Sequence, residues 1–268
     1  MYSATQNDAM TLMATLADKS VNAIITDPPY GQTQLAFDKA NRGASNICLS
    51  PDFWHEVWRV TDVFICTAIH PFTAQLVVMQ ERHYRHAYVW VKNVPTGWLD
   101  SKRKPLRKHE DIVVLATRQT VYNPQMGTGE RYVTKNLWGG DPLHYGNSER
   151  LSVTNDGERY PTTVLDVPED PDRFTYGVDV HPTQKPVALM EYLVKTYTHE
   201  GDTVLDPFMG SGTTGVACQR TGRHFIGCDI APEYVALANH RLAKTEMAYA
   251  PNKQGFTQLS LFASCDNL

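Results

Sequence analysis

The sequence predicts an α/β fold built on a doubly wound, mostly parallel sheet. Short apolar runs rich in β-branched residues alternate along the chain with segments whose apolar residues recur at helical spacing. Two of these runs end in Asp-Pro and a turn, at the place where open parallel sheets bind ligands. The chain has 268 residues, of which 42% are hydrophobic, enough for one sizeable core and an insertion.

The first part of the chain contains four strand candidates. Residues 21–26, "VNAIIT", stop at Asp27-Pro28-Pro29 and are expected to form a buried parallel strand. The other strands are expected at 62–68, 86–91 and 111–117. A helix is expected before the first strand, at 8–20, and two more between the strands, at 50–60 and 70–83, so the order is that of βαβ units.

The amino-acid composition changes after residue 117, where Gly, Pro, Asn, Asp, Tyr and Arg dominate and only short strand-like segments occur. Regular patterns then resume with helices at 185–199, 214–222 and 232–247 and strands at 203–206 and 224–230. We therefore expect one α/β domain whose first half covers 1–118 and whose second half covers 181–248. An insertion at 119–180 separates the halves, and a flexible tail follows at 249–268.

Composition and charge narrow the function classes. No apolar run approaches the roughly 18 residues of a membrane span, and no segment resembles a signal peptide, so a cytoplasmic protein is expected. The five cysteines lie far apart without metal-ligand spacing, so neither a metal site nor a disulfide framework is expected. With a net charge of −4, a nucleic-acid partner needs a local basic cluster, and residues 82–108 carry eight Lys/Arg against one acid.

The turn after the first apolar strand has the groups needed to activate an aromatic amine. Asp27 supplies a carboxylate, and two prolines lock φ, so the Pro28 carbonyl is expected to point rigidly outward. Tyr30 supplies a ring on which a planar base can stack. If the carboxylate and the carbonyl each accept one amine hydrogen, the nitrogen lone pair leaves the ring conjugation and the amine becomes a nucleophile.

The second Asp-Pro turn, "DPFMGSGTTG" at 206–215, is expected to hold the electrophile. Its glycines, including Gly210 and Gly212, have the G-x-G-x-x-G spacing that lets a nucleoside-bearing ligand approach a strand-to-helix turn. Asp206 is placed to attract a cationic amino-acid head. Asp229, 17 residues after Gly212 at the end of the next strand, is placed to bind ribose hydroxyls. An ammonium, a sulfonium and a ribose fit these groups better than a pyrophosphate does.

Three motifs, "TDPPYG", "HPTQKP" and "DPFMGSGTT", occur in an order typical of one enzyme family. On these motifs the chain resembles the β-ordered group of S-adenosylmethionine-dependent DNA amino-methyltransferases, over about residues 5–245. The resemblance implies a Rossmann-like, seven-stranded methyltransferase sheet with a catalytic half at 1–118, a target-recognition insertion at 119–180 and a cofactor-binding half at 181–248. It also implies S-adenosyl-L-methionine as the cofactor, double-stranded DNA as the substrate, and a homodimer.

The resemblance also assigns individual residues. The catalytic residues that it implies are Asp27, Pro28, Pro29 and Tyr30. The cofactor contacts that it implies are Asp8, His181, Thr183, Gln184, Lys185, Asp206, Phe208, Gly210, Gly212, Thr213 and Asp229. Thr183 and Lys185 would lie near the cofactor carboxylate and Asp8 near its adenine, although Asp8 can equally cap a helix and Lys185 can be a surface lysine. The DNA phosphate contacts would be Lys102, Arg103, Lys104, Arg107 and Lys108.

In the family that the chain resembles, an aspartate at the start of the tetrapeptide favours N6 of adenine as the methyl acceptor, whereas a serine there favours N4 of cytosine. We therefore expect an adenine-specific enzyme that extrudes its target base from the duplex, with an N4-cytosine enzyme as the alternative. Further alternatives are a methyltransferase of RNA or of a protein amide, a nicotinamide dehydrogenase and an inactive DNA-binding module. The long insertion disfavours the protein-amide enzyme, and the tetrapeptide disfavours the dehydrogenase. The complete motif set disfavours the inactive DNA-binding module. Restriction-modification, solitary and phage roles all stay open.

The tail contains "QLSLF", residues 258–262, in a polar surrounding. This segment resembles the short peptide with which bacterial replication proteins dock on the sliding clamp, and the contacts implied are Gln258, Leu259, Leu261 and Phe262. The apolar side chains can equally fold back on the domain. A clamp partner would place methylation behind the replication fork.

Overall fold

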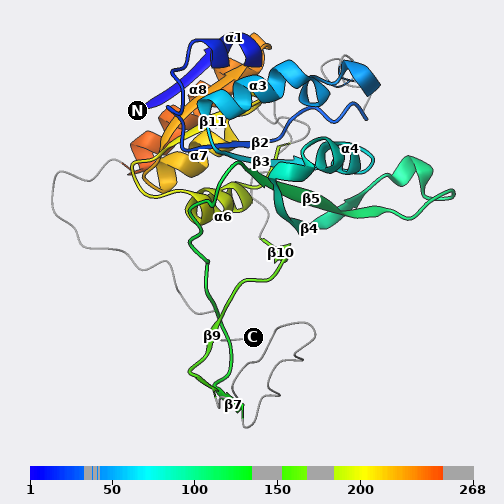
Figure 1. Cartoon of the computed structure of the whole chain (residues 1–268), viewed down its shortest axis with the longest axis vertical. Helices are drawn as coiled ribbons and strands as arrows, with labels where there is room; N and C mark the ends of the chain where they lie inside the picture. Colours follow the sequence, from blue (N-terminus) through cyan, green and yellow to red (C-terminus); the bar gives the residue numbers. More distant parts are fainter. Residues whose placement is uncertain (33–37, 39–40, 42, 135–152, 168–183, 250–268) are drawn as a thin grey trace.

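The computed structural model describes residues 1–32, 38, 41, 43–134, 153–167 and 184–249. Its centre is an eight-stranded sheet in the order β1-β12-β11-β2-β3-β5-β4-β10 (Figure 1). In that order the strands span Tyr2–Gln6, His224–Asp229, Thr203–Asp206, Ala23–Thr26, Val63–Ala68, Arg107–Ala116, Tyr84–Thr96 and Val164–Asp166. β5 pairs antiparallel with β3 and β4, and the other neighbours in this sheet pair in parallel. The predicted mostly parallel α/β sheet is therefore confirmed.

The sheet has one strand more than the seven expected from the resemblance. The additional strand is β10, three residues within the predicted insertion, which pairs with β4 through Val164 opposite Val89. β1 forms the other edge, and its partly exposed residues form no apolar run. Edge strands need less apolar sequence than central strands do, because fewer of their side chains are covered. Apolar patterning therefore identifies the central strands and not these two.

The strand order reverses between β11 and β2. From β2 the chain moves outward to β3, whereas from β11 it moves in the other direction to β12. β11 and β2 run parallel, with Val204 opposite Ala23, so both strands end at the same edge of the sheet. Open parallel sheets bind ligands at such a reversal. The two Asp-Pro turns begin at this position, one after Thr26 and the other at Asp206.

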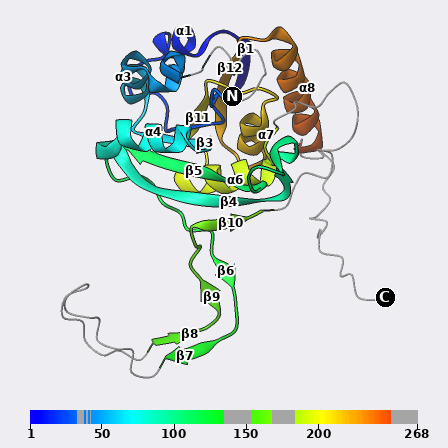
Figure 2. The same ribbon diagram turned by 90° about the vertical axis from the view of Figure 1, so that its right-hand side faces the viewer.

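Helices cover both faces of the sheet (Figure 2). One face carries α1, Ala9–Ala14; α3, Pro51–Val60; and α4, Phe72–Met79. The other carries α6, Val187–Tyr197; α7, Thr213–Arg220; and α8, Pro232–Tyr249. Successive strand residues alternate between the faces: Ile24 and Phe64 pack on the α3 side, and Ile25 and Ile65 on the α6 side. Burial on both faces explains why these strands read as continuous apolar runs.

The elements predicted for the two halves of the domain are present, with shifted ends. α3 begins at Pro51, which suits a first helical turn because no N–H is needed there. α4 ends before the predicted position, and its expected last turn is the 3₁₀ helix η3, Glu81–His83. β4 and β5 are longer than predicted because they form a hairpin that continues beyond the end of β3. The other short helices are η1, Gly43–Ser45; η2, Ile47–Leu49; and η4, Trp98–Asp100.

The described parts of the predicted insertion form two small antiparallel sheets. β6, Gly127–Thr128, pairs with β9, Glu158–Arg159, and β7, Tyr132–Thr134, pairs with β8, Val153–Asn155. Figure 2 shows both pairs beyond β10, away from the large sheet. Aromatic side chains such as Tyr132 and Tyr160 are exposed here. In its described part, this segment presents surface and adds little to the core.

The described part of the chain contains no helix with the length and apolar character needed to cross a membrane. Cys48, Cys66, Cys218 and Cys228 are buried free thiols. Burial raises the pKa of each of these thiols, so they are protonated and pack as small apolar side chains. Cys265 lies outside the described residues.

Candidate active site

A direct hydrogen bond joins the two Asp-Pro turns. Thr26, the last residue of β2, donates from Oγ1 to Asp206 Oδ1 at 2.6 Å. Asp27 follows Thr26 directly, so the predicted catalytic corner and the predicted cofactor turn lie side by side at one edge of the sheet. Group transfer between ligands held by two turns requires this proximity.

The Asp27 carboxylate is fixed by three donors from different parts of the chain. Its Oδ1 accepts hydrogen bonds from the hydroxyl of Tyr30, at 2.5 Å, and from the hydroxyl of Thr67 on β3. Its Oδ2 accepts from Lys185 Nζ at 2.8 Å. Asn46 Nδ2 donates to the Pro29 carbonyl at 2.9 Å and anchors the turn from the side. Two prolines and these contacts leave the corner little freedom to rotate.

The Tyr30 ring packs in the protein and does not stand free in solvent. Its centroid lies 5.7 Å from that of Phe72 in a stacked arrangement, and Lys185 Nζ lies 5.6 Å from it. Burial, together with the negative charges of Asp27 and Glu110, raises the pKa of Tyr30 well above its usual value. The phenol is therefore neutral and serves as a hydrogen-bond donor to Asp27. Its predicted stacking on a base stays a prediction.

Behind Asp27 lies a series of alternating charges, which we call the charge row: Asp27, Lys185, Glu110 and Lys92. Lys185 Nζ is 2.8 Å from Asp27 Oδ2 and 3.3 Å from Glu110 Oε2. Glu110 Oε1 is 3.1 Å from Lys92 Nζ, which also donates to Thr96 at 3.0 Å. The side chains of Lys185, Glu110 and Lys92 are only 8%, 13% and 4% exposed. Water is largely excluded from these three side chains, whereas Asp27, which is 23% exposed, forms the open end of the charge row.

The pairing in the charge row keeps its inner members ionised. Burial alone would lower the pKa of Lys185, but the carboxylates of Asp27 and Glu110 raise it above the ordinary value. Burial acts to raise the pKa of Glu110, and the ammonium groups of Lys185 and Lys92 outweigh that effect and lower it. Both groups are therefore charged at neutral pH.

Sequence reasoning missed three of these residues and the contact that a fourth makes with Asp27. It did not identify Thr67, Lys92 or Glu110, whose only signal is a polar side chain at the end of an apolar strand pattern. Lys185 was expected near the cofactor carboxylate, and the structure adds its contact with Asp27. It is buried, so its reading as a surface lysine is wrong.

Asp206 is a buried carboxylate in the floor of the second turn. It accepts from Thr26, from Thr214 Oγ1 at 2.7 Å and from the Phe208 amide at 3.1 Å. Burial raises its pKa to about 6 in spite of these donors. The ring of Phe208 lies 6.0 Å from that of Phe53, which ties the turn to the core under α3.

The glycine turn is shaped by a second carboxylate and by helix packing. Gly210 and Gly212 have φ values of 49° and 75°. Asp229, at the end of β12, accepts from the Gly210 amide at 3.1 Å and from the Ala231 amide at 2.9 Å. Burial raises the pKa of Asp229. The hydroxyl of Thr213, at the start of α7, lies 3.0 Å from the Arg241 guanidinium.

Asp8 caps a helix at the same edge of the sheet. Its Oδ1 accepts from the Thr11 amide at 2.9 Å, and the bonds from Thr11 lower its pKa. The neighbouring Asn7 amide donates to the Asp229 carbonyl at 3.1 Å, so the cap lies close to the end of β12. Gln184 is half-buried beside Lys185 in the chain. His181 and Thr183 lie outside the described residues.

The structure divides the basic run at 82–108 among three places. Arg82 lies in η3 and Arg85 at the start of β4, whereas Lys92 is buried in the charge row. The five predicted phosphate contacts lie in the turn of the β4–β5 hairpin and at the start of β5. β3 ends at Ala68 opposite Asp111, so this turn extends past the edge that carries Asp27. Lys102, Arg103, Lys104 and Lys108 are exposed, and Arg107 is half-buried.

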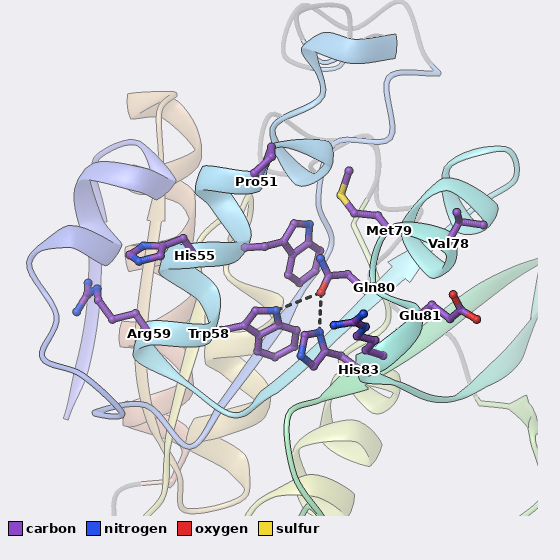
Figure 3. Close-up of a pocket in the computed structure, with 11 residues that line it drawn as sticks. Pro51, His55, Trp58, Arg59, Val78, Met79, Gln80, Glu81 and His83 are labelled. Atoms are coloured by element: carbon purple, nitrogen blue, oxygen red, sulfur yellow. Dashed lines mark hydrogen bonds between the residues drawn. The ribbon is translucent and has the colours of Figure 1, made fainter.

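A second cavity of the described structure does not contribute to this site. A surface groove of about 690 Å³ lies between α3 and the α4–η3 segment (Figure 3). There Trp58 Nε1 and His83 Nδ1 both lie within hydrogen-bond distance of Gln80 Oε1, at 3.1 and 3.0 Å, and none of the predicted site residues lines the groove. The tail residues Gln258, Leu259, Leu261 and Phe262 lie outside the described residues.

Comparisons with known proteins agree with the motifs. Residues 21–240 match the family described as DNA methylase. The type II methyltransferase M2.DpnII of Streptococcus pneumoniae is 26% identical over 253 residues, which cover 88% of this chain and 87% of that protein. The solved complex of M1.HpyAVI with S-adenosylmethionine has a TM-score of 0.58 at 26% identity and covers 90% of this chain and 99% of its own.

A more distant structure shows the fold alone. PvuII DNA methyltransferase, which is cytosine-N4-specific, has a TM-score of 0.62 at 16% identity, over 90% of this chain and 86% of its own. S-Adenosylmethionine is the cofactor of the matched family, as the motifs predicted. From the match over residues 21–240, the chain belongs to the family of S-adenosylmethionine-dependent N6-adenine/N4-cytosine DNA methyltransferases.

Proposed function

We propose that this DNA methyltransferase moves the methyl group of S-adenosylmethionine to N6 of adenine in double-stranded DNA. The observation that carries the proposal is the rigid corner Asp27 to Tyr30, joined to the cofactor turn through the bond from Thr26 to Asp206. The aspartate at the first position of the tetrapeptide supports adenine over N4 of cytosine as the acceptor.

Asp27 has capacity for one further donor. A carboxylate accepts about four hydrogen bonds. Asp27 receives two at Oδ1 and one at Oδ2, so the remaining position is at Oδ2. One hydrogen of the adenine amine would bond there and the other to the Pro28 carbonyl. Both bonds turn the nitrogen lone pair away from the ring and towards the methyl donor, and Tyr30 stacks on the base.

The transfer needs positioning more than it needs a base. When bound, the cofactor supplies a methyl group on a positively charged sulfur. The nitrogen forms its bond to the methyl carbon as the carbon–sulfur bond breaks in line, and the amine becomes cationic. The Asp27 carboxylate stabilises this developing charge. The amine becomes acidic only at that stage, so it then releases a proton to water and no strong base is required.

The turn after β11 suits a cationic ligand that carries a ribose. The carboxylates of Asp206 and Asp229 lie at the ends of adjacent strands, and the turn 206–215 itself contains no Lys or Arg. We assign the amino-acid head to Asp206 and the ribose to Asp229. The other proposed contacts are Asp8, Gln184, Lys185, Phe208, Gly210, Gly212 and Thr213, with His181 and Thr183 beyond the described part of the chain.

The DNA duplex would lie along the edge of the sheet where both turns open. The exposed basic side chains of the β4–β5 turn are proposed to hold phosphates, and the target base is extruded into the site between the two turns. In this arrangement 1–118 is the catalytic half, 119–180 recognises the target and 181–248 is the cofactor half. The family resemblance also supports a homodimer as a proposal. The likeness of residues 258–262 to a clamp-docking peptide supports a sliding clamp as a second proposed partner.

Replacement of Asp27 tests the assignment. Asp27→Ala should keep cofactor binding near the wild-type level and abolish methyl transfer, because the amine loses its orienting carboxylate. Asp52→Ala, which removes an exposed carboxylate from the first turn of α3, is the control and should remain active. Transfer of tritiated methyl groups to duplex DNA, followed by nucleoside analysis, reads out both rate and product. N4-methylcytosine as the wild-type product would refute adenine as the methyl acceptor. Full activity of Asp27→Ala would refute the role of Asp27 in orienting the amine.

A further inference from the structure

The charge row behind Asp27 contains an acidic residue that none of the sequence motifs includes. We propose that Glu110 is a positioning residue: it holds Lys185 in place and thereby fixes both the orientation and the charge balance of the catalytic carboxylate. This inference rests on the proposed role of Asp27. Glu110 does not touch the reacting atoms and acts through Lys185, which contacts both carboxylates at 2.8 and 3.3 Å.

The first argument concerns orientation. Rotation of the Asp27 carboxylate is resisted at Oδ1 by Tyr30 and Thr67 and at Oδ2 by Lys185. A lysine side chain is long and has several rotatable bonds, so it restrains its partner only if its own ammonium is held. Glu110 provides that second attachment point from β5. The free acceptor position at Oδ2 therefore depends on Glu110 for its direction.

The second argument concerns charge. The amine becomes cationic during methyl transfer, so a net negative corner favours the reaction. Asp27 alone supplies one negative charge, but the buried ammonium of Lys185 beside it cancels that charge. The negative charge of Glu110 offsets the positive charge of Lys185. The positive charge of Lys92, on the far side of Glu110, keeps the whole charge row neutral. Without Glu110, the corner that faces the amine would lose its negative character.

Stability does not account for this arrangement. Buried ion pairs often contribute less than well-packed apolar residues of the same volume, because both charges lose their water. Here four charged side chains come together from the turn after β2, from β4, from β5 and from the segment before α6. A function at Asp27 explains why charges rather than apolar groups occupy this space.

The primary test compares two charge-removing variants. Glu110→Gln keeps the side-chain volume and should lower kcat about 10- to 100-fold, with the KM for S-adenosylmethionine and for DNA changed little. Glu56→Gln is the matched control, because Glu56 is also paired, with Arg59 at 2.7 Å, and its side chain is 16% exposed against 13% for Glu110. It should keep the wild-type kcat. Glu110→Asp keeps the charge and should recover part of the rate.

A double-mutant cycle shows whether Glu110 acts through Lys185. In a Lys185→Met background, Glu110→Gln should lower kcat by less than twofold further, because the side chain that it holds is gone. A role in folding alone would lower kcat by the same factor in both backgrounds. If Glu110→Gln does not fold, Lys92→Met/Glu110→Gln removes one cation and one anion together and should show the same loss of kcat.

Three results would overturn the inference: an unchanged kcat in Glu110→Gln, a loss confined to either KM, or additive losses in the cycle. Failure of the proposed function can be told apart from failure of this inference, because it shows in the wild-type protein and in Asp27→Ala. A wild-type protein that does not methylate adenine in DNA, or an active Asp27→Ala, refutes that function whatever Glu110→Gln does.

Discussion

Asp206 holds a carboxylate in the interior at a cost in stability. The residue is 3% exposed, and burial raises its pKa from 3.8 to about 6 although Thr26, Thr214 and the Phe208 amide all donate to it. An ionised group in that environment favours the unfolded state relative to the folded one. Its retention is consistent with a role in binding a cationic ligand, because functional sites often contain groups that reduce stability.

The pH dependence of stability tests this cost. The pKa of Asp206 is higher in the folded state than in the unfolded state. Its contribution to the free energy of unfolding therefore falls as pH rises from about 4 to about 6 and stays low above that. Asp206→Asn should therefore be more stable than the wild type at pH 8, by up to about 3 kcal/mol, and the difference should vanish below about pH 4. Urea unfolding at several pH values measures the difference.

Asp62 provides a control of opposite sign for this measurement. Although burial acts to raise the pKa of Asp62, the hydrogen bonds from Lys19 and Thr117 lower it overall. The unfolded state therefore binds more protons near that pKa, and the carboxylate stabilises the fold at neutral pH. Asp62→Asn should be less stable than the wild type at pH 8. Equal pH profiles for the Asp206 and Asp62 variants would contradict the burial argument.

At the residue scale, sequence reasoning finds groups that follow a recognisable strand. Asp27, Asp206 and Asp229 each end or follow an apolar run, so their place at one edge is predictable. Glu110 could not be found in this way. Its contact with Lys185 depends on β5 pairing antiparallel with β3, and apolar periodicity does not determine which strands become neighbours.

At the scale of elements, the glycine turn is set by helix packing as well as by its left-handed backbone conformation. Gly212 has φ of 75°, and a Cβ there would lie 2.8 Å from Ala238 Cβ on α8. Gly201 has a similar φ of 83° with no atom within 4 Å of the added Cβ. The two positions therefore separate backbone strain from steric overlap.

Alanine at these two glycines should have unequal effects on stability. Gly201→Ala should cost about 1–2 kcal/mol from the left-handed backbone alone. Gly212→Ala should cost about 1–3 kcal/mol more, because its Cβ overlaps α8. Ala238→Gly in the same chain removes the facing Cβ and should recover part of the extra loss. Urea unfolding measures the free energy of unfolding of all three variants. Equal losses at both glycines would show that α8 moves away from the added Cβ without a cost in stability.

Elements also show where sequence patterns lose information. The basic run at 82–108 looks like one patch along the chain, but the hairpin separates its two ends and buries Lys92 between them. The central strands are predicted because they are covered on both faces, whereas the edge strands β1 and β10 are not. Side-chain periodicity reports burial, so it cannot show where a long hairpin ends or which exposed segment joins an edge.

At the scale of the whole molecule, DNA binding needs a local source of positive potential. The chain carries a net charge of −4, which repels a polyanion at long range. The β4–β5 turn places exposed cations beyond the edge where Asp27 and Asp206 lie. A duplex held there would present its bases to both turns, whereas a duplex held at the start of β4 would lie at the opposite edge.

Salt dependence of DNA binding distinguishes these two edges. Lys102→Ala/Arg103→Ala should weaken duplex binding at low salt and reduce the slope of log K against log salt by about 2, because about one counterion is released for each phosphate contact. Arg82→Ala/Arg85→Ala removes two exposed cations from η3 and the adjoining start of β4, at the opposite edge, and should leave the slope unchanged. Fluorescence anisotropy of a labelled duplex across a salt series measures both. Both variants change the net charge equally, so a general electrostatic effect would lower both slopes alike. A fall confined to the Arg82/Arg85 variant would place the duplex away from the Asp27 edge and contradict the proposed active site.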